Sequence, residues 1–474
     1  MERKLDSNRR IVLVKPNHPV KGILIPPIGL GYLAASVREN TDWDVFILDA
    51  FRDNLSLKKT IEEILRFDPD VVGITMYSRD YASVKRISAG LKQIKPGLSI
   101  IVGGPHPSAV PELTMNDIPE LDYIIVGEGE IPLALFLNQI SIGKNGFDKI
   151  PNLVRRDKQT KIIINPLTSE DNLDIFGTPA WDLIDPRKYP PRPHGAFFKN
   201  LPIAPIIVTR GCPYQCTYCG GHLVTGRKIR WRSIEAVIKE IGLLVERFGV
   251  KEIHIEDDNF TFNKDYVMRF CAELNKLKYE LSLACPTGLR LDMLDEELVK
   301  TMESAGFYYF AVGVEIASRR LLKKLKRNMT PEAMKDKINM VARATRIRIL
   351  ALLLFGLPTE TKDEIYETLK FALTMPFHRA DFGIFVPLPG TEIFDELVKE
   401  GKLELESFDF ENIMSDKVFV SLGDISLFEL RLLKVYLNLR FYMRPKIIWG
   451  ILKDIKRISN LNTIIRRIAE YFVK

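Results

Sequence analysis

Short apolar runs alternate with amphipathic segments of helical period along the first 140 residues. Runs of this length, bounded by polar turns, predict buried strands, and the segments between them predict helices. Five such units in series predict a doubly wound parallel sheet, which binds ligands at the carboxyl ends of its strands. The runs are Ile11 to Val14, Val45 to Leu48, Val71 to Thr75, Ile100 to Val102 and Tyr123 to Val126.

A second alternating series begins near residue 203 and predicts six further βα units, enough for a partial barrel. One of its helices has clear end signals, with Ser233 as N-cap and Gly249 as terminator. The predicted strands are Pro205 to Thr209, Glu252 to Glu256, Leu281 to Cys285, Tyr309 to Glu315, Ile349 to Phe355 and Phe382 to Val386.

The two series divide the 474 residues into four parts. We predict a ligand-binding Rossmann-like domain over 1–140, a proline-rich linker over 141–202, a barrel over 203–400 and a helical, basic region over 401–474. The fold class is therefore α/β: an N-terminal doubly wound (flavodoxin-like) parallel sheet, a partial (β/α)6 TIM-type barrel and a helical C-terminal tail.

The net charge of +7 is concentrated at one end of the chain. Residues 431–474 carry eleven Lys or Arg against two acids, a charge of +9, which leaves −2 for the preceding 430 residues. That distribution argues against a nucleic-acid partner for the body of the protein. The polar start, Met1 to Arg10, predicts neither a signal peptide nor a membrane span, and hence a cytoplasmic location.

Three of the five cysteines, Cys212, Cys216 and Cys219, form a C-x3-C-x2-C loop directly after the first barrel strand. Three thiolates can bind three irons of a 4Fe-4S cubane and leave the fourth iron open. Structural zinc would want four ligands, commonly in paired C-x2-C units, and no second pair exists. Cys271 lies on an apolar helical face, so we expect it in the core. Cys271 and Cys285 together are too few cysteines to hold a second ordinary cubane.

From about residue 200 to 400 the chain resembles the radical S-adenosylmethionine (SAM) superfamily. The resemblance rests on the cysteine loop, on Gly313-Val314-Glu315 after the fourth barrel strand and on the Phe355 to Thr361 segment after the fifth. It implies that SAM chelates the open iron and that an external one-electron reductant, flavodoxin or ferredoxin, drives release of a 5′-deoxyadenosyl radical. The residues it assigns to SAM are Tyr218, Gly220, Gly221, Glu315 and Gly356.

His222 stands where the family's glycine motif has an acidic residue, so we assign it no role. Asp257 and Asp258 after the second barrel strand also fit the family pattern, although a capping or turn role suits them equally.

The N-terminal domain has no G-x-G-x-x-G fingerprint after its first strand. Its Pro26 to Ala34 segment, its glycine-containing strand ends and Pro179-Ala180-Trp181-Asp182 in the linker instead resemble the cobalamin-binding domain of class B radical SAM methyltransferases. The D-x-H-x-x-G element is absent, so the resemblance implies no protein histidine on cobalt. The implied cobalamin contacts are Thr75, Tyr77, Ser78, Gly103, Gly104, Gly127 and Glu128.

A degenerate βαβ domain that only supports the barrel is the alternative to cobalamin binding. In the tail, apolar residues at helical spacing alternate with Lys453, Lys456 and Arg457 around Trp449. Such a helix can lie in an anionic membrane interface, or it can pack its apolar face on the barrel.

These features together predict a cobalamin-dependent radical SAM enzyme that methylates an unactivated carbon of a small molecule or lipid. One alternative is a cyclase acting on a lipid or tetrapyrrole without methyl transfer. Another is a noncatalytic cobalamin or iron-sulfur sensor, although the sequence shows no DNA-binding or signalling module.

Overall fold

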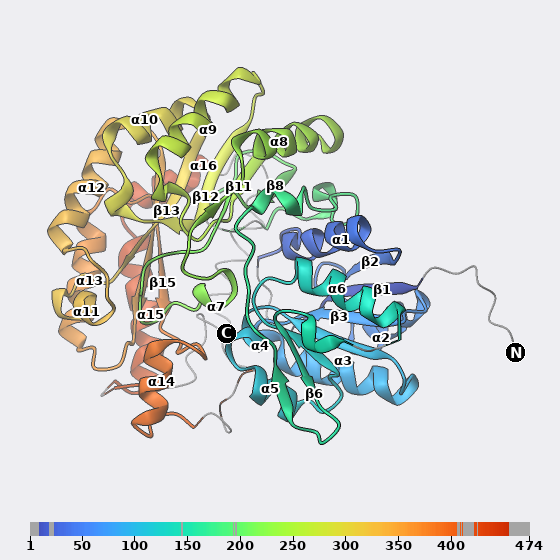
Figure 1. Cartoon of the computed structure of the whole chain (residues 1–474). Coiled ribbons are helices and arrows are strands. Elements are labelled where there is room, and N and C mark those ends of the chain that lie inside the picture. Colours follow the sequence, from blue (N-terminus) through green and yellow to red (C-terminus); the bar gives the residue numbers. More distant parts are fainter. Residues whose placement is uncertain are drawn as a thin grey trace, which may run out of the picture.

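A computed structural model describes residues 9–18, 23–143, 146–192, 194, 197–404, 408, 410, 421–423 and 425–454. Two largely parallel sheets, each covered by helices, stand side by side, with the N-terminal sheet on one side and the barrel on the other (Figure 1). The predicted fold class is confirmed, and each of the eleven predicted runs overlaps a strand.

The N-terminal sheet has the order β2-β1-β3-β4-β5-β6-β7. Its first five strands are parallel, whereas β6 and β7, from the segment that we predicted as a linker, add antiparallel to its edge. The chain reverses its direction of travel across the sheet between β1 and β3, which makes this the switch point where ligands bind. The strands are β1 (Arg10–Lys15), β2 (Asp44–Asp49), β3 (Val71–Thr75), β4 (Ser99–Gly103), β5 (Tyr123–Ile125), β6 (Leu153–Arg156) and β7 (Ile162–Ile164).

Both faces of this sheet are buried, because side chains alternate along each strand. From β1, Ile11 and Leu13 pack with one pair of helices, α1 and α6, while Val12 and Val14 pack with α2 and α3 on the other face. The helices are α1 (Ile28–Asn40), α2 (Leu57–Arg66), α3 (Tyr81–Ile94), α4 (Pro105–Ala109), α5 (Pro111–Asp117) and α6 (Glu130–Ser141).

The second sheet is an open barrel of six parallel strands in the order β15-β14-β13-β12-β11-β8. Along β13, Tyr309 and Ala311 face a small interior cluster, while Phe310 and Val312 join the large core beneath the surrounding helices. The strands are β8 (Ile203–Ile206), β11 (Glu252–Ile255), β12 (Ser282–Leu289), β13 (Phe307–Glu315), β14 (Arg348–Phe355) and β15 (Arg379–Ile384).

Helix α8 has the two predicted end signals: the Ser233 hydroxyl accepts from the Ala236 amide, and Gly249 adopts a left-handed φ of 63°. No helix among the described residues is long and apolar enough to cross a bilayer. The helices of this half are α8 (Ile234–Phe248), α9 (Lys264–Lys276), α10 (Glu296–Ser304), α11 (Arg319–Lys324), α12 (Pro331–Ala344), α13 (Lys362–Thr374), α14 (Glu392–Lys399), α15 (Leu427–Tyr442) and α16 (Pro445–Asp454).

Candidate active site between the two sheets

The cysteine loop is closed at its base by a short antiparallel pair, β9 (Thr209–Arg210) and β10 (Arg230–Trp231). Gly211 begins the loop with a φ of +95°, and a Cβ there would lie 2.2 Å from the Lys228 carbonyl oxygen. Only glycine fits this position, because a side chain would collide with backbone on the returning strand. The loop, which includes α7 (His222–Thr225), therefore has a fixed path where Cys212 leaves the sheet.

The Asp257 carboxylate fixes the strand end that leads into this loop. It accepts from the Val208 amide at 2.7 Å, the Thr209 amide at 2.8 Å and the Thr209 hydroxyl at 2.9 Å. Asp258 accepts from the Thr225 hydroxyl at 2.7 Å, at the other side of the loop. Of the roles left open for these acids, the structure shows that both brace the cysteine loop.

The three loop cysteines are free thiols, and each of them is at least partly accessible. Burial, with smaller contributions from Asp258, Cys216 and Cys212, raises the pKa of Cys219 to about 11. Burial also raises the pKa of Cys212. A bound iron would stabilise the thiolates of these two cysteines against that effect. No group of Cys, His, Asp or Glu among the described residues is arranged to hold a single metal ion.

The other two cysteines lie away from the loop. Cys271 of α9 is 0% exposed and Cys285 of β12 is 1% exposed, and both belong to the core between the barrel and its helices. The prediction that Cys271 is a core residue is confirmed.

Glu315 lies next to the cysteine loop, at the end of β13. Its backbone has a φ of +63°, and the pairing of β13 with β14 shifts register between Gly313 and Glu315. Burial raises the pKa of its carboxyl, while Arg327 and a hydrogen bond to Tyr218 oppose that rise. A Cβ on Gly313 would lie 2.8 Å from a Glu315 carboxylate oxygen, so the glycine provides the room that this carboxylate occupies.

Arg327 is a site residue that our sequence analysis missed. It donates to the Gly313 carbonyl, and its pKa is raised by Tyr218, Glu315 and Cys216 against the effect of its burial. Arg327, Glu315 and Tyr218 thus bring one cation, one carboxylate and one phenol beside a cluster cysteine. This donor set fits SAM, whose amino acid and ribose groups carry both hydrogen-bond donors and acceptors.

Gly356, also predicted to contact SAM, begins the segment after β14 with a φ of +81°. Its amide already donates to Glu360 at 2.6 Å, as does the Leu357 amide at 3.1 Å. Gly220 and Gly221 lie at the start of α7, where a Cβ on Gly221 would come 3.4 Å from Asp258 Oδ1. His222 Nδ1 is 3.0 Å from the Cys219 carbonyl oxygen.

The predicted cobalamin contacts meet at the carboxyl edge of the N-terminal sheet. The amide of Met76, between Thr75 and Tyr77, donates to the Gly103 carbonyl at 2.8 Å. Ser78 Oγ lies 2.9 Å from His106 Nδ1. Gly104 has a φ of +110°, and a Cβ there would approach the Met76 carbonyl oxygen to 3.0 Å. The loops after β3 and β4 are therefore packed closely against one another.

The same edge holds buried polar atoms that have no hydrogen-bond partner among the described residues. They are His18 Nδ1 after β1, Arg79 Nε and Asp80 Oδ1 after β3, and His106 Nε2 after β4, of which Arg79 Nε and Asp80 Oδ1 lie 4.0 Å apart as an ion pair. Buried polar groups are normally paired, so three loops around the switch point share a need for donors and acceptors. Cobalamin carries amide groups that offer both, and these residues fit it.

Tyr77 of the cobalamin edge lies near Glu256 of the barrel. Its side chain is 48% exposed, and its pKa is raised by burial and by the Asp80 and Glu256 carboxylates, against the effect of Arg79. Glu256 follows β11, and its Oε2 lies 2.7 Å from His194 Nδ1, while its Oε1 is buried without a hydrogen-bond partner among the described residues. Glu256 and His194 are further residues that the sequence analysis missed.

Gly127 and Glu128 lie at the boundary between the two halves of the chain. The Gly127 amide donates to Ser108 Oγ at 2.9 Å. Both carboxylate oxygens of Glu128 accept from arginines of the barrel half, Arg210 and Arg230. The Glu128 carboxylate therefore joins the two halves, and a cofactor contact of this residue remains a prediction.

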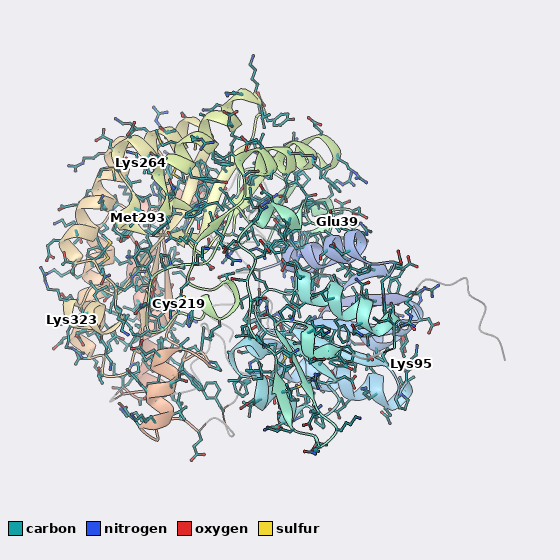
Figure 2. All side chains as sticks on the ribbon, in the orientation of Figure 1. Glu39, Lys95, Cys219, Lys264, Met293 and Lys323 are labelled. Carbon is teal, nitrogen blue, oxygen red and sulfur yellow. The ribbon has the colours of Figure 1, made fainter. Side chains whose placement is uncertain are left out.

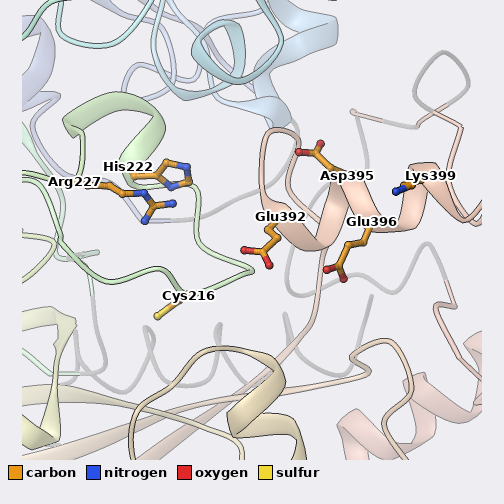
Figure 3. A pocket seen from close by; sticks show the side chains of 7 residues that line it. All are labelled: Cys216, His222, Arg227, Glu392, Asp395, Glu396 and Lys399. Carbon is orange, nitrogen blue, oxygen red and sulfur yellow. The ribbon is translucent and has the colours of Figure 1, made fainter.

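Cys216 lines an open pocket of about 390 Å³ beside the cysteine loop. Figure 3 shows His222 and Arg227 on the same side of it as Cys216, facing Glu392, Asp395, Glu396 and Lys399 of α14. Figure 2 shows Cys219 in the middle of the molecule, between the barrel side that carries Lys323 and the N-terminal side that carries Lys95. The loop thus lies between the two halves, with Cys219 exposed and Cys216 lining an open pocket.

Two family models match the chain: the B12 binding domain over residues 21–137 and the radical SAM superfamily over residues 206–372. An uncharacterized methyltransferase of Pyrococcus horikoshii is 30% identical and aligns over 92% of this chain and 91% of its own. Cytidylyl-2-hydroxyethylphosphonate methyltransferase of Streptomyces wedmorensis is 27% identical over 80% of this chain and 79% of its own.

The radical SAM methyltransferase TsrM of Kitasatospora setae, solved with cobalamin and a 4Fe-4S cluster, has the same fold. Its TM-score is 0.68 at 19% identity, with 83% of this chain and 78% of TsrM covered.

The chain belongs to the cobalamin-binding radical SAM enzymes. It is therefore an enzyme, and its cofactors are a 4Fe-4S cluster, SAM and cobalamin. Both resemblances seen in the sequence are confirmed, and the sensor alternative is not supported.

Proposed function

We propose that the enzyme methylates an unactivated carbon, in a substrate that lies between the cobalamin edge of the N-terminal sheet and the cysteine loop of the barrel. The observation that carries the proposal is the contact between these two edges. A Cβ on Gly127 would lie 3.5 Å from the Val224 carbonyl oxygen of α7, and the Glu256 carboxylate of the barrel is close enough to Tyr77 to raise the pKa of its phenol.

When bound, the cluster and SAM supply a radical that removes hydrogen from carbon, and cobalamin supplies the methyl group; such chemistry belongs to cofactors rather than to side chains. The protein contributes position. Cys212, Cys216 and Cys219 would hold the cluster, while Glu315, Arg327 and Tyr218 would orient SAM beside it. The loops after β3 and β4 would hold cobalamin with their unpaired polar atoms.

A lipid is the substrate class that we propose, because α15 and α16 expose large apolar side chains on the barrel. We also propose that flavodoxin or ferredoxin delivers the electron from the side of the pocket at Cys216, where a cluster cysteine is open to solvent. A cytoplasmic location follows from the need for a reductant and for free thiols.

The test begins with anaerobic reconstitution of iron, sulfide and cobalamin on the full chain. We expect about four irons per chain and reductant-dependent formation of 5′-deoxyadenosine from SAM. Cys216→Ala should lose both the cluster and SAM cleavage. Cys271→Ala is the matched control, because Cys271 is buried in the core away from the loop, and it should keep both.

The transferred group is then followed with methyl-labelled SAM fed to cells with and without the gene. Label is expected in a lipid that appears only with the gene. An unlabelled, gene-dependent lipid or tetrapyrrole that has gained a ring would refute methyl transfer and favour the cyclase. A labelled water-soluble product would refute the lipid class alone.

A further inference from the structure

Helix α15 is apolar on two opposite faces, of which the barrel covers one. Leu430, Leu433, Leu437 and Phe441 are 0 to 8% exposed and belong to the barrel core. A second row of apolar side chains runs along the opposite side of the helix for its whole length, within an arc of about 80° around the helix axis. Its members are Phe428, Leu432, Val435, Leu439 and Met443, which are 38 to 69% exposed. A helix with apolar rows on two opposite sides normally has a packing partner on each side.

Helix α16 repeats this arrangement. Ile447 is buried, whereas Ile448, Trp449 and Leu452 are 43%, 61% and 53% exposed and fall on one side of the helix. Including Tyr436, eight of the 22 large hydrophobic side chains that are exposed among the described residues lie in these two helices, and a ninth, Met443, lies between them. Single exposed hydrophobic residues are ordinary, but a contiguous group marks an interaction surface.

The charge around this apolar surface is positive. Residues 427–454 contain six Lys or Arg and two acids, a charge of +4. Both acids are paired with barrel residues, Glu429 with Lys362 at 2.5 Å and Asp454 with Arg348 at 2.7 Å. Arg440, Lys446 and Lys453 are exposed, and Lys453 Nζ lies 5.3 Å from the centre of the Trp449 ring.

This charge discriminates between the possible partners of the surface. Residues 455–474, which follow α16, have five Lys or Arg and one acid, also +4. Either that segment or a second copy of the same surface would bring like charges together. An anionic bilayer would attract the cations and accept the apolar rows, and tryptophan and lysine beside one another suit its interface.

We propose that the exposed rows of α15 and α16 dock the enzyme on an anionic lipid bilayer. The first turn of α15 lies at the active-site end of the barrel: a Cβ on Gly356 would lie 3.2 Å from Leu430, on the buried face of that turn, and Phe428 lies on its exposed face. Docking through the exposed row would therefore bring this end of the barrel toward the membrane. Docking itself does not depend on the proposed methyl transfer, although it supports the lipid substrate.

The test is sedimentation of the full-length holoenzyme with phosphatidylcholine vesicles, with and without phosphatidylglycerol, in the absence of SAM and reductant. Vesicles that contain phosphatidylglycerol should bind at least about tenfold more tightly, and high salt should weaken that binding. Leu432→Glu and Trp449→Glu should each lower the affinity about tenfold or more. Lys446→Gln with Lys453→Gln should lower it about fivefold for each charge. Brominated lipid should quench Trp449, the only tryptophan of the four in the exposed class.

Ile142→Glu is the matched control, because Ile142 is 76% exposed but lies in the N-terminal half, and it should bind as the parent does. Unchanged melting temperatures show that all variants are folded. Equal loss in Ile142→Glu and Leu432→Glu, or no binding to phosphatidylglycerol vesicles, would overturn the proposal. So would a dimer that Leu432→Glu dissociates but that binds no vesicles. Because no substrate is present, these outcomes leave the methylation experiments untouched.

Discussion

The Arg210 guanidinium donates to Glu128 at 3.1 Å, and so ties the cysteine loop to the cobalamin-binding half of the chain. Arg210 also donates to Glu130 at 2.7 Å, and it lies two residues before Cys212. All three side chains are 6 to 8% exposed, so the pairs are buried and rigid. Their geometry sets where the cluster stands relative to the cobalamin edge.

Glu128→Gln should therefore destabilise the fold. Glu128 also pairs with Arg230, so the change removes the negative charge that faces two buried guanidinium groups. Breaking a buried pair costs about 3 to 5 kcal/mol, measured here as a lower urea midpoint of unfolding. The matched control is Arg38→Gln at the Arg38–Asp182 pair, where the side chains are 43% and 41% exposed, with an expected cost below about 1 kcal/mol. Equal effects of the two changes would show that the pair does not hold the halves together.

The sequence predicted the strands well but not this pairing. Apolar runs such as Ile11 to Val14 indicate a buried strand, because burial shows in the pattern of neighbouring residues. Glu128 and Arg210 are 82 residues apart, and nothing in either segment indicates the other. Gly104 was predicted from the sequence as a cobalamin contact, which remains a prediction, whereas its close approach to the Met76 backbone is visible only in the fold. Arg327 was missed because its role comes from α11 ending beside β13, which only the fold shows.

Glu315→Gln should weaken SAM binding to the cluster-loaded enzyme by about tenfold or more. The amide keeps the shape but loses the charge, and a hydrogen bond to a charged group contributes about 1.5 to 3 kcal/mol. Binding of labelled SAM by equilibrium dialysis measures the change. Glu332→Gln is the control, since Glu332 pairs with Arg319 on the surface, at 63% and 62% exposed, and it should leave the affinity unchanged. SAM bound with parental affinity by Glu315→Gln would remove this carboxylate from the SAM site.

Glu360 should make stability depend on pH, because burial raises its pKa from 4.5 to about 7. The folded state then holds the proton more tightly than the unfolded state. The contribution of Glu360 to the free energy of unfolding is complete below pH 4.5 and is lost as the pH rises through 7. It amounts to about 3 kcal/mol. Glu360→Gln keeps an oxygen for the two backbone amides and removes the titration.

Melting temperatures across this pH range test the prediction. The melting temperature of the parent should fall relative to that of Glu360→Gln as the pH rises from about 4.5 to 8. Glu364 gives the opposite sign, because Arg320 and Ser318 overcome its partial burial and lower its pKa to about 2. Glu364→Gln should therefore lose stability at neutral pH, and the parent's advantage over it should vanish only in acid. Parallel pH profiles for the parent and Glu360→Gln would contradict the assignment.

Glu256 and Glu252 form a natural comparison inside the barrel, because each pairs with a histidine. Glu252 lies four residues earlier in the chain, and both of its carboxylate oxygens have hydrogen-bond partners. They accept from Tyr308 Oη at 2.7 Å, from two backbone amides and from His254. Among the described residues Glu256 has His194 as its hydrogen-bond partner, and its second oxygen is buried with none. A buried unpaired carboxylate oxygen costs free energy, so we expect a bound ligand to donate to it.

Cobalamin is the ligand that we expect, because Glu256 is close enough to Tyr77 of the cobalamin edge to raise the pKa of that phenol. Glu256→Leu should lower the affinity for hydroxocobalamin by about tenfold or more, read from the change in its visible spectrum during titration. Glu256→Gln keeps an acceptor and should lose less. Glu246→Leu, an exposed change at a residue bonded to Tyr279, is the matched control and should bind as the parent does. If Glu256→Leu also binds hydroxocobalamin normally, the donor is not cobalamin, and the substrate becomes the remaining candidate for that oxygen.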